Sequence, residues 1–234
     1  MTMHIQILNP NAQTDIAPRL ADLVRARCEG DATVAWQTLE HAPAYLDHPG
    51  ALAALVPDMR RALQCAVPRP DLALVACFSD ARRELAEGSA PFPVFTIADY
   101  SIIALGLRGQ PFSIVTGGTA WVGPIRDHVH ALGFADLLSS VRASPGNALQ
   151  IMRPGSDARR AFDALLDACV AEDGAAGVLL AGGGFIGAGP VFRMQRSTDG
   201  LFDCGELAAE VAGRIVAGRL DCTSPAALID GLRP

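Results

Sequence analysis

The sequence predicts an α/β fold with two pseudo-symmetric lobes, each a mainly parallel sheet flanked by helices. Three observations support this prediction. Short apolar runs alternate with stretches of helical periodicity, the chain passes through this alternation twice, and 50% of its 234 residues are hydrophobic. A chain of this length can bury one large core or two small ones.

Short apolar runs bounded by polar or turn residues are typical of buried parallel strands. We expect strands over residues 4–8, 33–37, 72–76, 94–97, 112–116, 138–142, 178–181 and 201–203. Between these runs, apolar residues at three- and four-residue spacing predict helices over residues 15–28, 57–65, 99–107, 122–132, 157–170 and 206–219. This order favours β-α-β units with helices on both faces of each sheet, and leaves 144–156 as a loose segment.

The repeated pattern divides the chain into two lobes. We expect a first lobe from residues 1–98 together with 207–234, because the last long helix would return to it, and a second lobe from residues 99–206. Ligands of such folds bind at the carboxyl ends of the parallel strands. We therefore expect the functional site in the cleft between the lobes.

The composition excludes several classes of protein. All 19 basic residues are arginine, and without lysine the chain lacks both the Schiff base of a pyridoxal phosphate enzyme and the motif lysine of a P-loop hydrolase. A formal net charge of −6 and scattered arginines argue against nucleic acid as a partner. No apolar run reaches about 18 residues and the first residues lack signal-peptide features, so we expect no membrane partner and a cytoplasmic location.

The six cysteines and five histidines are dispersed along the chain. They form no C-x-x-C pair, which argues against a disulfide framework and against a zinc site. His128 and His130 are two residues apart on an expected helix, so their side chains would point to different faces. We therefore expect no metal site.

Cys77 is the residue best placed for chemistry. It follows the apolar run 72–76 and opens a polar loop in which Ser79 would offer a hydroxyl and Asp80 would precede a helix. A free cysteine is often a buried structural residue, but a helix N-terminus beside a strand end can lower the pKa of a thiol and make it a base or nucleophile. The matching place in the second half of the chain is occupied by Gly182.

Polar groups at other strand ends would hold a carboxylate, imide or enolate oxygen without a fixed cation. Asn9 and Asn11 follow the first strand, and Thr116, Gly117 and Gly118 form a turn after a later one. An ordinary turn with a helix cap explains the two asparagines equally well.

The remaining candidates carry weaker signals. Residues 182–187 match the dinucleotide pattern G-x-G-x-x-G with Asp203 further on, but Pro190 leaves little room for the helix that would receive a pyrophosphate. We interpret this segment as a tight structural turn. Asp99 would either face the cleft or begin a helix, and Cys204 is the one other thiol expected to approach the site.

The chain resembles the aspartate/glutamate racemase superfamily, and most closely its hydantoin racemase branch. The resemblance rests on motifs spread over nearly the whole chain: residues 9–11, 76–78, 93–94, 97–99, 112–117 followed by Trp121, and the glycine-rich segment 180–189. It implies an enzyme of two lobes with no cofactor, a small-molecule substrate and a homo-oligomer. In this family two facing cysteines remove a proton from one side of an activated Cα and return one to the other side.

Carried over by position, Cys77 matches the first catalytic cysteine of the family, whereas the second falls on Gly182. The resemblance thus implies an acid/base on one side, unless Cys204, a water or another group replaces the missing thiol. The expected substrate contacts surround these two positions and comprise Asn9, Asn11, Phe78, Ser79, Thr116, Gly117, Gly118, Trp121, Gly183 and Phe185.

The resemblance implies a racemase or isomerase acting at the carbon next to a carbonyl in a small hydantoin, amino acid or related carboxylate. Two alternatives stay open. With one cysteine the chain would act as a decarboxylase, like the arylmalonate decarboxylase relatives, which protonate a planar enolate from a single face. Otherwise it would bind a small ligand without turning it over.

Overall fold

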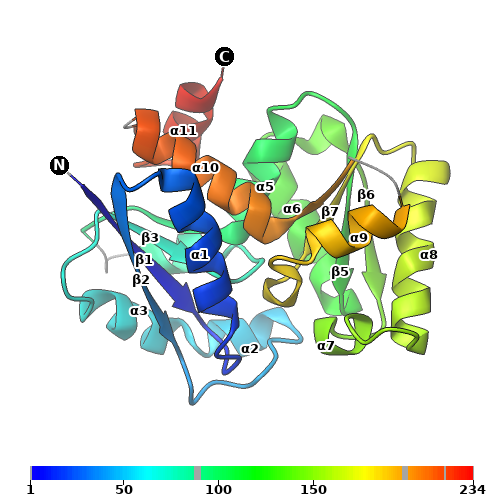
Figure 1. Ribbon diagram of the computed structural model, residues 1–234, viewed down its shortest axis with the longest axis horizontal. Coiled ribbons are helices and arrows are strands. Elements are labelled where there is room, and N and C mark those ends of the chain that lie inside the picture. Colours follow the sequence, from blue (N-terminus) through cyan, green and yellow to red (C-terminus); the bar gives the residue numbers. More distant parts are fainter. Residues whose placement is uncertain (1, 87–90, 197–199, 219, 234) are drawn as a thin grey trace.

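Two four-stranded parallel sheets form the centre of the protein (Figure 1). The structure is a computed structural model and describes residues 2–86, 91–196, 200–218 and 220–233. The strand order is β2-β1-β3-β4 in the first sheet and β6-β5-β7-β8 in the second, so the two sheets repeat one topology. The predicted α/β fold with two similar lobes is confirmed.

Within the described residues, eight strands coincide with the eight apolar runs of the sequence. The first sheet contains β1 (Met3–Asn9), β2 (Ala32–Thr38), β3 (Leu72–Val75) and β4 (Val94–Thr96), and the second contains β5 (Phe112–Gly117), β6 (Leu138–Ser144), β7 (Gly177–Ala181) and β8 (Leu201–Asp203). All residues of β3 and β7 are buried, as their uninterrupted apolar sequences predict for inner strands covered on both faces.

The six predicted helices are also present. They are α1 (Ile16–Cys28), α3 (Val56–Gln64), α5 (Ile97–Gly106), α6 (Val122–Ala131), α8 (Asp157–Ala171) and α10 (Cys204–Gly218). Their apolar spacing buries one face of most of them, for example Leu20 and Val24 of α1. The short 3-10 helices η1 (Thr119–Trp121), η2 (Ala135–Leu137) and η3 (Gly183–Phe185) lie in connections of the second lobe.

Five shorter helices are not predicted by the sequence analysis. They are α2 (Pro49–Ala53), α4 (Ala81–Ala86), α7 (Ala148–Ile151), α9 (Gly189–Arg196) and α11 (Pro225–Leu232). Side-chain caps rather than long periodic patterns set the starts of three of them, with His48 before α2, Asn147 before α7 and Ser224 before α11. The expectation of a loose segment over 144–156 is wrong because α7 lies within it.

The expectation that Pro190 leaves little room for a helix is also wrong. Helix α9 begins at Gly189, and Pro190 lies in its first turn, where a backbone N–H has no helical partner to lose. Asp203 is nevertheless occupied: its carboxylate accepts the N–H of Gly189 at 2.9 Å, of Gly205 at 2.8 Å and of Glu206 at 2.9 Å. Asp203 therefore organises the starts of α9 and α10, which fits the structural interpretation of the glycine-rich segment.

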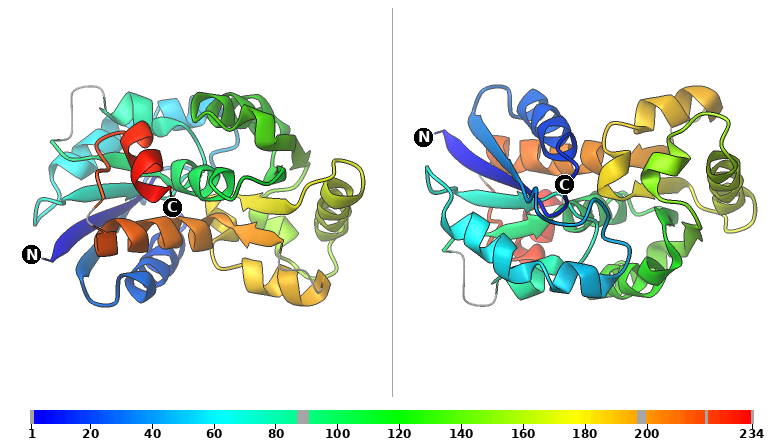
Figure 2. Two further views of the ribbon diagram at one scale, coloured as in Figure 1. Left: turned by 90° about the horizontal axis from the view of Figure 1, so that it is seen from above. Right: turned by 90° about the horizontal axis from the view of Figure 1, so that it is seen from below.

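Helices α5 and α10 lie side by side where the lobes meet (Figure 2). Every residue of α5 is buried, and α10 packs against both α5 and α1. The approach to α1 is close, since a Cβ on Gly213 would lie 2.8 Å from the Arg27 carbonyl oxygen. The lobe boundaries at residues 98 and 206 stay predictions.

One apolar core crosses from the first lobe into the second. It joins Ile7 of β1 and Tyr100 of α5 to Ile114 of β5 and Leu179 of β7, while a smaller cluster forms around Phe162 of α8. The two lobes therefore share buried side chains beneath the line where their strand ends meet.

No helix in the described part of the chain is both long and apolar enough to cross a bilayer. The cytoplasmic location and the homo-oligomer stay predictions.

Candidate active site

A cavity of about 460 Å³ lies between the lobes at the carboxyl ends of the strands, within the range of about 300–1,000 Å³ typical of small-ligand sites. Its wall comes from the segments that follow β1, β2, β3, β5, β6 and β7. The lining residues are Asn11, Gln13, Tyr45, Leu46, Asp47, Ala76, Cys77, Phe78, Thr116, Gly117, Gly118, Trp121, Pro145, Gly146, Asn147, Ala148, Gln150, Ala181, Gly182, Gly183, Gly184 and Phe185.

Cys77 and Gly182 occupy equivalent places in the two sheets. Val75 is the last residue of β3 that pairs with β4, and Leu180 is the last residue of β7 that pairs with β8. Cys77 and Gly182 each follow two residues later, and both line the cavity. The cavity wall therefore carries a thiol on the side of the first lobe and bare backbone on the side of the second.

The Cys77 side chain is half-buried in the cavity wall. Burial raises the pKa of its thiol from 9.0 to about 11, and the nearby Ser79 hydroxyl lowers the pKa by a smaller amount. The expectation of a lowered pKa is wrong, because the loss of hydration outweighs the nearby donors. Cys77 is therefore a protonated thiol at neutral pH.

We predict that alkylation of Cys77 by iodoacetamide accelerates about tenfold per pH unit between pH 7 and 10 and levels off near pH 11, because the thiolate is the reactive form. Peptide mass mapping measures this rate. The raised pKa also has a consequence for stability: the contribution of the protonated Cys77 thiol to the free energy of unfolding is fully present below pH 9 and is lost as the pH rises through 11. A plateau of the alkylation rate below pH 9 would contradict the prediction.

Ser79 lies just behind Cys77 and is not part of the cavity wall. Its side chain is buried, and its hydroxyl makes no well-formed hydrogen bond to any described residue. A buried hydroxyl without a partner is costly, so Ser79 is available to the Cys77 sulfur or to an ordered water.

The asparagines after β1 have different roles. Asn9 is fully buried behind the wall, and its side-chain nitrogen donates to the backbone oxygens of Asn11 at 3.0 Å and of Gln13 at 2.7 Å. It therefore shapes the loop rather than facing the cavity. Asn11 and Gln13 line the cavity, and the Asn11 side-chain oxygen accepts the Gln13 N–H at 2.9 Å.

The turn after β5 forms the opposite part of the wall. Thr116, Gly117 and Gly118 all line the cavity, and a Cβ on Gly117 would lie 2.9 Å from the Gly146 carbonyl oxygen, so glycine is required there. The Gly118 N–H already donates to the carbonyl oxygen of Ser144 at 2.9 Å. This turn therefore shapes the cavity wall and contributes the Thr116 hydroxyl, whereas the Gly118 N–H is already used within the protein.

Trp121 connects the two lobes above this turn. Its side chain is buried against the cavity, and its indole N–H donates to the Leu46 carbonyl oxygen at 3.0 Å. The loop after β2, which carries Tyr45, Leu46 and Asp47, is thereby held at the cavity.

The segment after β7 presents glycines to the cavity. Gly182 has a φ of +138°, a conformation that other residues rarely adopt, and Gly183 and Phe185 line the cavity beside it as predicted. Cys204 lies behind this turn, fully buried, with its Sγ donating to the Gly182 carbonyl oxygen at 3.3 Å. It thus approaches the site from the interior, and burial raises its pKa well above the ordinary value.

Several wall residues are missed by the sequence analysis. They are Gln13, Tyr45, Leu46, Asp47, Ala76, Pro145, Gly146, Asn147, Ala148, Gln150, Ala181 and Gly184. Most follow β2 and β6, the outer strands of the two sheets. The rule that ligands bind at carboxyl ends would have indicated these loops had it been applied to outer as well as inner strands.

No arginine or histidine is among the described residues that line the cavity. Its ionisable groups are Cys77, the Tyr45 hydroxyl, which is buried, and Asp47, whose side chain is 80% exposed. The polar wall therefore consists mainly of neutral amides and hydroxyls.

A second group of ionisable side chains lies outside the cavity wall. Asp99 begins α5 in a capping box with Thr96, so of its two expected roles the structure shows the helix start. Its Oδ1 lies 2.9 Å from His128 Nε2, and Asp80 Oδ1 lies 3.8 Å from the same nitrogen. His130 is exposed, which confirms that the two histidines point to different faces.

The ligand atoms of Asp80, Asp99 and His128 lie within 4.8 Å of one another, close enough to surround a metal ion. The sequence analysis does not foresee this group, because its members come from different elements. Arg82 Nε already lies 3.4 Å from Asp99 Oδ1 and supplies positive charge. We interpret the group as an ion-pair cluster.

The family model for Asp/Glu/hydantoin racemases matches residues 5–212 of this chain. The chain belongs to this family. Its similarity to a hydantoin racemase of Paenarthrobacter aurescens is 26% identity over 229 residues, covering 92% of each chain. The predicted membership of the racemase superfamily is confirmed, and this relative supports the hydantoin racemase branch.

Solved structures of racemase-fold proteins agree with this assignment. An allantoin racemase from Pseudomonas fluorescens superimposes with a TM-score of 0.81 at 20% identity, over 99% of this chain and 97% of that one. A variant of arylmalonate decarboxylase in its liganded form superimposes with a TM-score of 0.59 at 17% identity, over 93% and 94% of the two chains. Both share the two-lobe fold.

Proposed function

We propose that this protein is a cofactor-independent racemase or isomerase acting at the carbon next to a carbonyl of a small hydantoin-like compound, with Cys77 as the acid/base. The observation that carries this proposal is the Cys77 thiol in the wall of an interlobe cavity, in a chain of the Asp/Glu/hydantoin racemase family. Relatives named for hydantoin and allantoin support this substrate class.

The charge of the cavity favours an uncharged ring over an amino acid or a dicarboxylate. A carboxylate that leaves water for this cavity would find no cationic side chain among the described lining residues. Such desolvation without a counter-charge is costly. A cyclic amide, in contrast, needs donors and acceptors of the kind that Asn11, Gln13, Asn147 and Gln150 carry.

In the proposed reaction, the Cys77 thiolate takes the proton from one face of the substrate carbon, and a water on the side of Gly182 protonates the other face. In the return direction the water takes the proton and the Cys77 thiol donates one. The high pKa of Cys77 makes its thiolate a strong base and keeps the thiol loaded with a proton for the return step. Negative charge develops meanwhile on the carbonyl oxygen of the substrate. Gly183 and Gly184 line the cavity at the start of η3, where the first N–H groups of a helix have no partner within it, so these N–H groups are candidates to hold that oxygen.

A second candidate function follows from Gly182. We interpret this position as that of the second cysteine of the family, so that protonation occurs from the side of Cys77 alone unless a water serves the other side. One-sided protonation suits an enzyme that exchanges a proton with retention, or a lyase that protonates an enolate after loss of carbon dioxide.

Incubation of single enantiomers of 5-substituted hydantoins in heavy water tests the proposal, with chiral chromatography and proton NMR as readouts. Loss of optical purity together with deuterium uptake supports the racemase. Uptake with retained configuration supports one-sided proton exchange, and carbon dioxide release from an arylmalonate supports the lyase. If a hydantoin raises the melting temperature while none of these reactions occurs, the protein binds without catalysis and the proposed function is wrong.

A further inference from the structure

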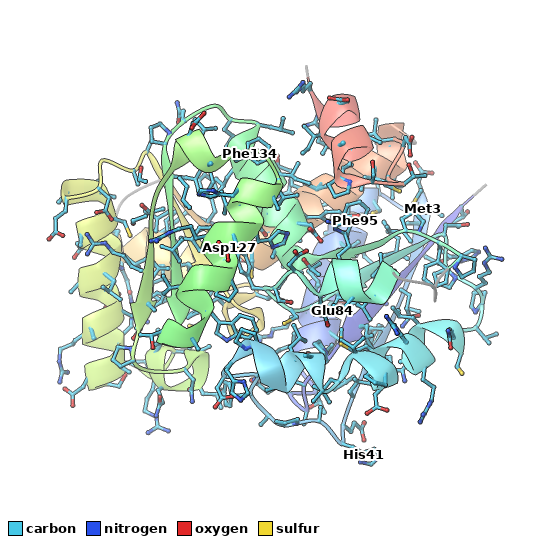
Figure 3. All side chains as sticks on the ribbon, turned by 180° about the vertical axis from the view of Figure 1, so that it is seen from behind. Met3, His41, Glu84, Phe95, Asp127 and Phe134 are labelled. Carbon is cyan, nitrogen blue, oxygen red and sulfur yellow. The ribbon has the colours of Figure 1, made fainter. Side chains whose placement is uncertain are left out.

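We propose that His128 is a positioning residue for Cys77. Through Asp80 and Asp99, the imidazole of this second-lobe residue fixes the loop of residues 77–80 that presents the sulfur to the cavity. This inference rests on the proposed function of Cys77. Figure 3 shows, from behind, the two helices that flank this contact, α6 with Asp127 labelled and α4 with Glu84 labelled.

His128 lies in the last turn of α6, the helix that starts directly after Trp121 at the cavity. Its side chain is 2% exposed, and its Nε2 lies 2.9 Å from Asp99 Oδ1. A buried imidazole at this distance from a carboxylate is held in one orientation, because its rotation would leave a buried polar atom without a hydrogen-bond partner. One helix thus connects the cavity wall to the cluster.

Asp99 is the fixed point of the cluster. It is fully buried, and its Oδ2 accepts the Thr96 N–H at 2.7 Å and the Thr96 hydroxyl at 2.9 Å. Its Oδ1 faces both His128 and Arg82. The carboxylate therefore cannot rotate without breaking the cap of α5.

Asp80 is the less buried partner. Its side chain is 30% exposed, yet its Oδ1 is buried and makes no hydrogen bond to any described residue, and His128 Nε2 lies 3.8 Å from it. Outside the helices and strands, no backbone hydrogen bond joins residues 77–80 to another described residue. The loop is therefore held by side-chain contacts, those of the buried Phe78 ring on one side and of Asp80 on the other.

Removing the imidazole would take away the polar neighbour of the buried Asp80 oxygen, which favours rotation of this carboxylate into water. Cys77 is three residues away on the same loop, so the sulfur would move with it. Displacements of about 1 Å at a reacting group cost roughly 100-fold in rate. Greater exposure would also move the pKa of the Cys77 thiol back toward its ordinary value.

The test compares His128→Asn with His130→Asn, an exposed histidine on the same helix. In His128→Asn at pH 8 we expect Cys77 to be alkylated about tenfold faster and kcat to fall about 10- to 100-fold with little change in KM. His130→Asn should change neither. His128→Gln, whose amide nitrogen reaches close to the position of Nε2, should restore most of kcat.

Other cysteines serve as internal references in the same peptide maps. The alkylation rate of exposed Cys65 measures the reactivity of the reagent, and that of buried Cys169 measures general loosening of the fold. Faster alkylation at Cys77 alone supports the proposal, whereas a parallel rise at Cys169 assigns His128 to general stability and overturns it. Unchanged alkylation of Cys77 in a folded His128→Asn protein overturns it as well.

Asp80→Asn decides the question if His128→Asn does not fold, because Asp80 is partly exposed and its replacement leaves the buried pair of Asp99 and His128 intact. Faster alkylation of Cys77 is again the supporting result, and an unchanged rate is the contrary one. Alkylation requires no substrate, so failure of the proposed reaction and failure of this proposal are separate outcomes.

Discussion

Replacement of Cys77 by alanine is expected to lower α-proton exchange in a hydantoin by about 10³-fold or more, because it removes the proposed acid/base from the cavity wall. Cys77→Ser should lose about as much, since an alcohol is a far weaker acid than a thiol. The rate of deuterium incorporation, followed by NMR at several enzyme concentrations, measures this loss.

Cys65→Ala is the matched control, because Cys65 is an exposed thiol outside the cavity. Its exchange rate should equal that of the unaltered protein. Exchange that continues at full rate in a folded Cys77→Ala protein would remove Cys77 from the mechanism.

The second large effect is expected at Gly182. Gly182→Cys adds a thiol to the second-lobe side of the cavity wall, and its Cβ would meet the Phe185 ring at 3.5 Å, which is ordinary van der Waals contact. The φ of +138° is unfavourable for any side chain, so the substitution should cost about 1–3 kcal/mol of unfolding free energy. We nevertheless expect the ratio of racemisation to proton exchange to rise, because a second face of the substrate gains a proton donor.

Gly182→Ala separates these two effects. It carries the same backbone strain without a thiol, so the melting temperature of both variants should fall by about 2–4 °C for each kcal/mol of lost unfolding free energy. The ratio of racemisation to proton exchange should rise in the cysteine variant alone. Chiral chromatography and deuterium content from one sample give this ratio. Equal ratios in the two variants would mean that the lack of a thiol at residue 182 does not limit racemisation.

The sheets and long helices can be predicted because their signals are local. Strands such as β3 and β7 are continuous apolar runs, and α1 or α8 bury one face at helical spacing over many residues. The boundary between β4 and α5 is less accurate: Thr96 caps the helix and Asp99 returns the bond, so the helix already begins at Ile97, which the sequence analysis gives to the strand. Short helices escape prediction because a few capping residues decide them.

The same distinction between local signals and contacts made on folding applies to the candidate site. Cys77 and Asn11 are found from the sequence because they follow strands whose carboxyl ends meet at the cavity. The raised pKa of Cys77 cannot be predicted from the sequence, because it depends on how much water the folded chain removes from the sulfur. The buried pair of Asp99 and His128 joins residues of separate helices, and nothing local in either segment indicates the contact.

The close contact of α10 with α1 has a consequence for how this architecture can be divided. Residues 204–218 follow the entire second sheet, yet they cover a helix that forms near the beginning of the chain. A gene fragment that stops after β4 would leave uncovered the side of α1 that packs on α10, and such a product would aggregate. The first sheet and its helices therefore reach completion only after nearly all of the polypeptide has left the ribosome.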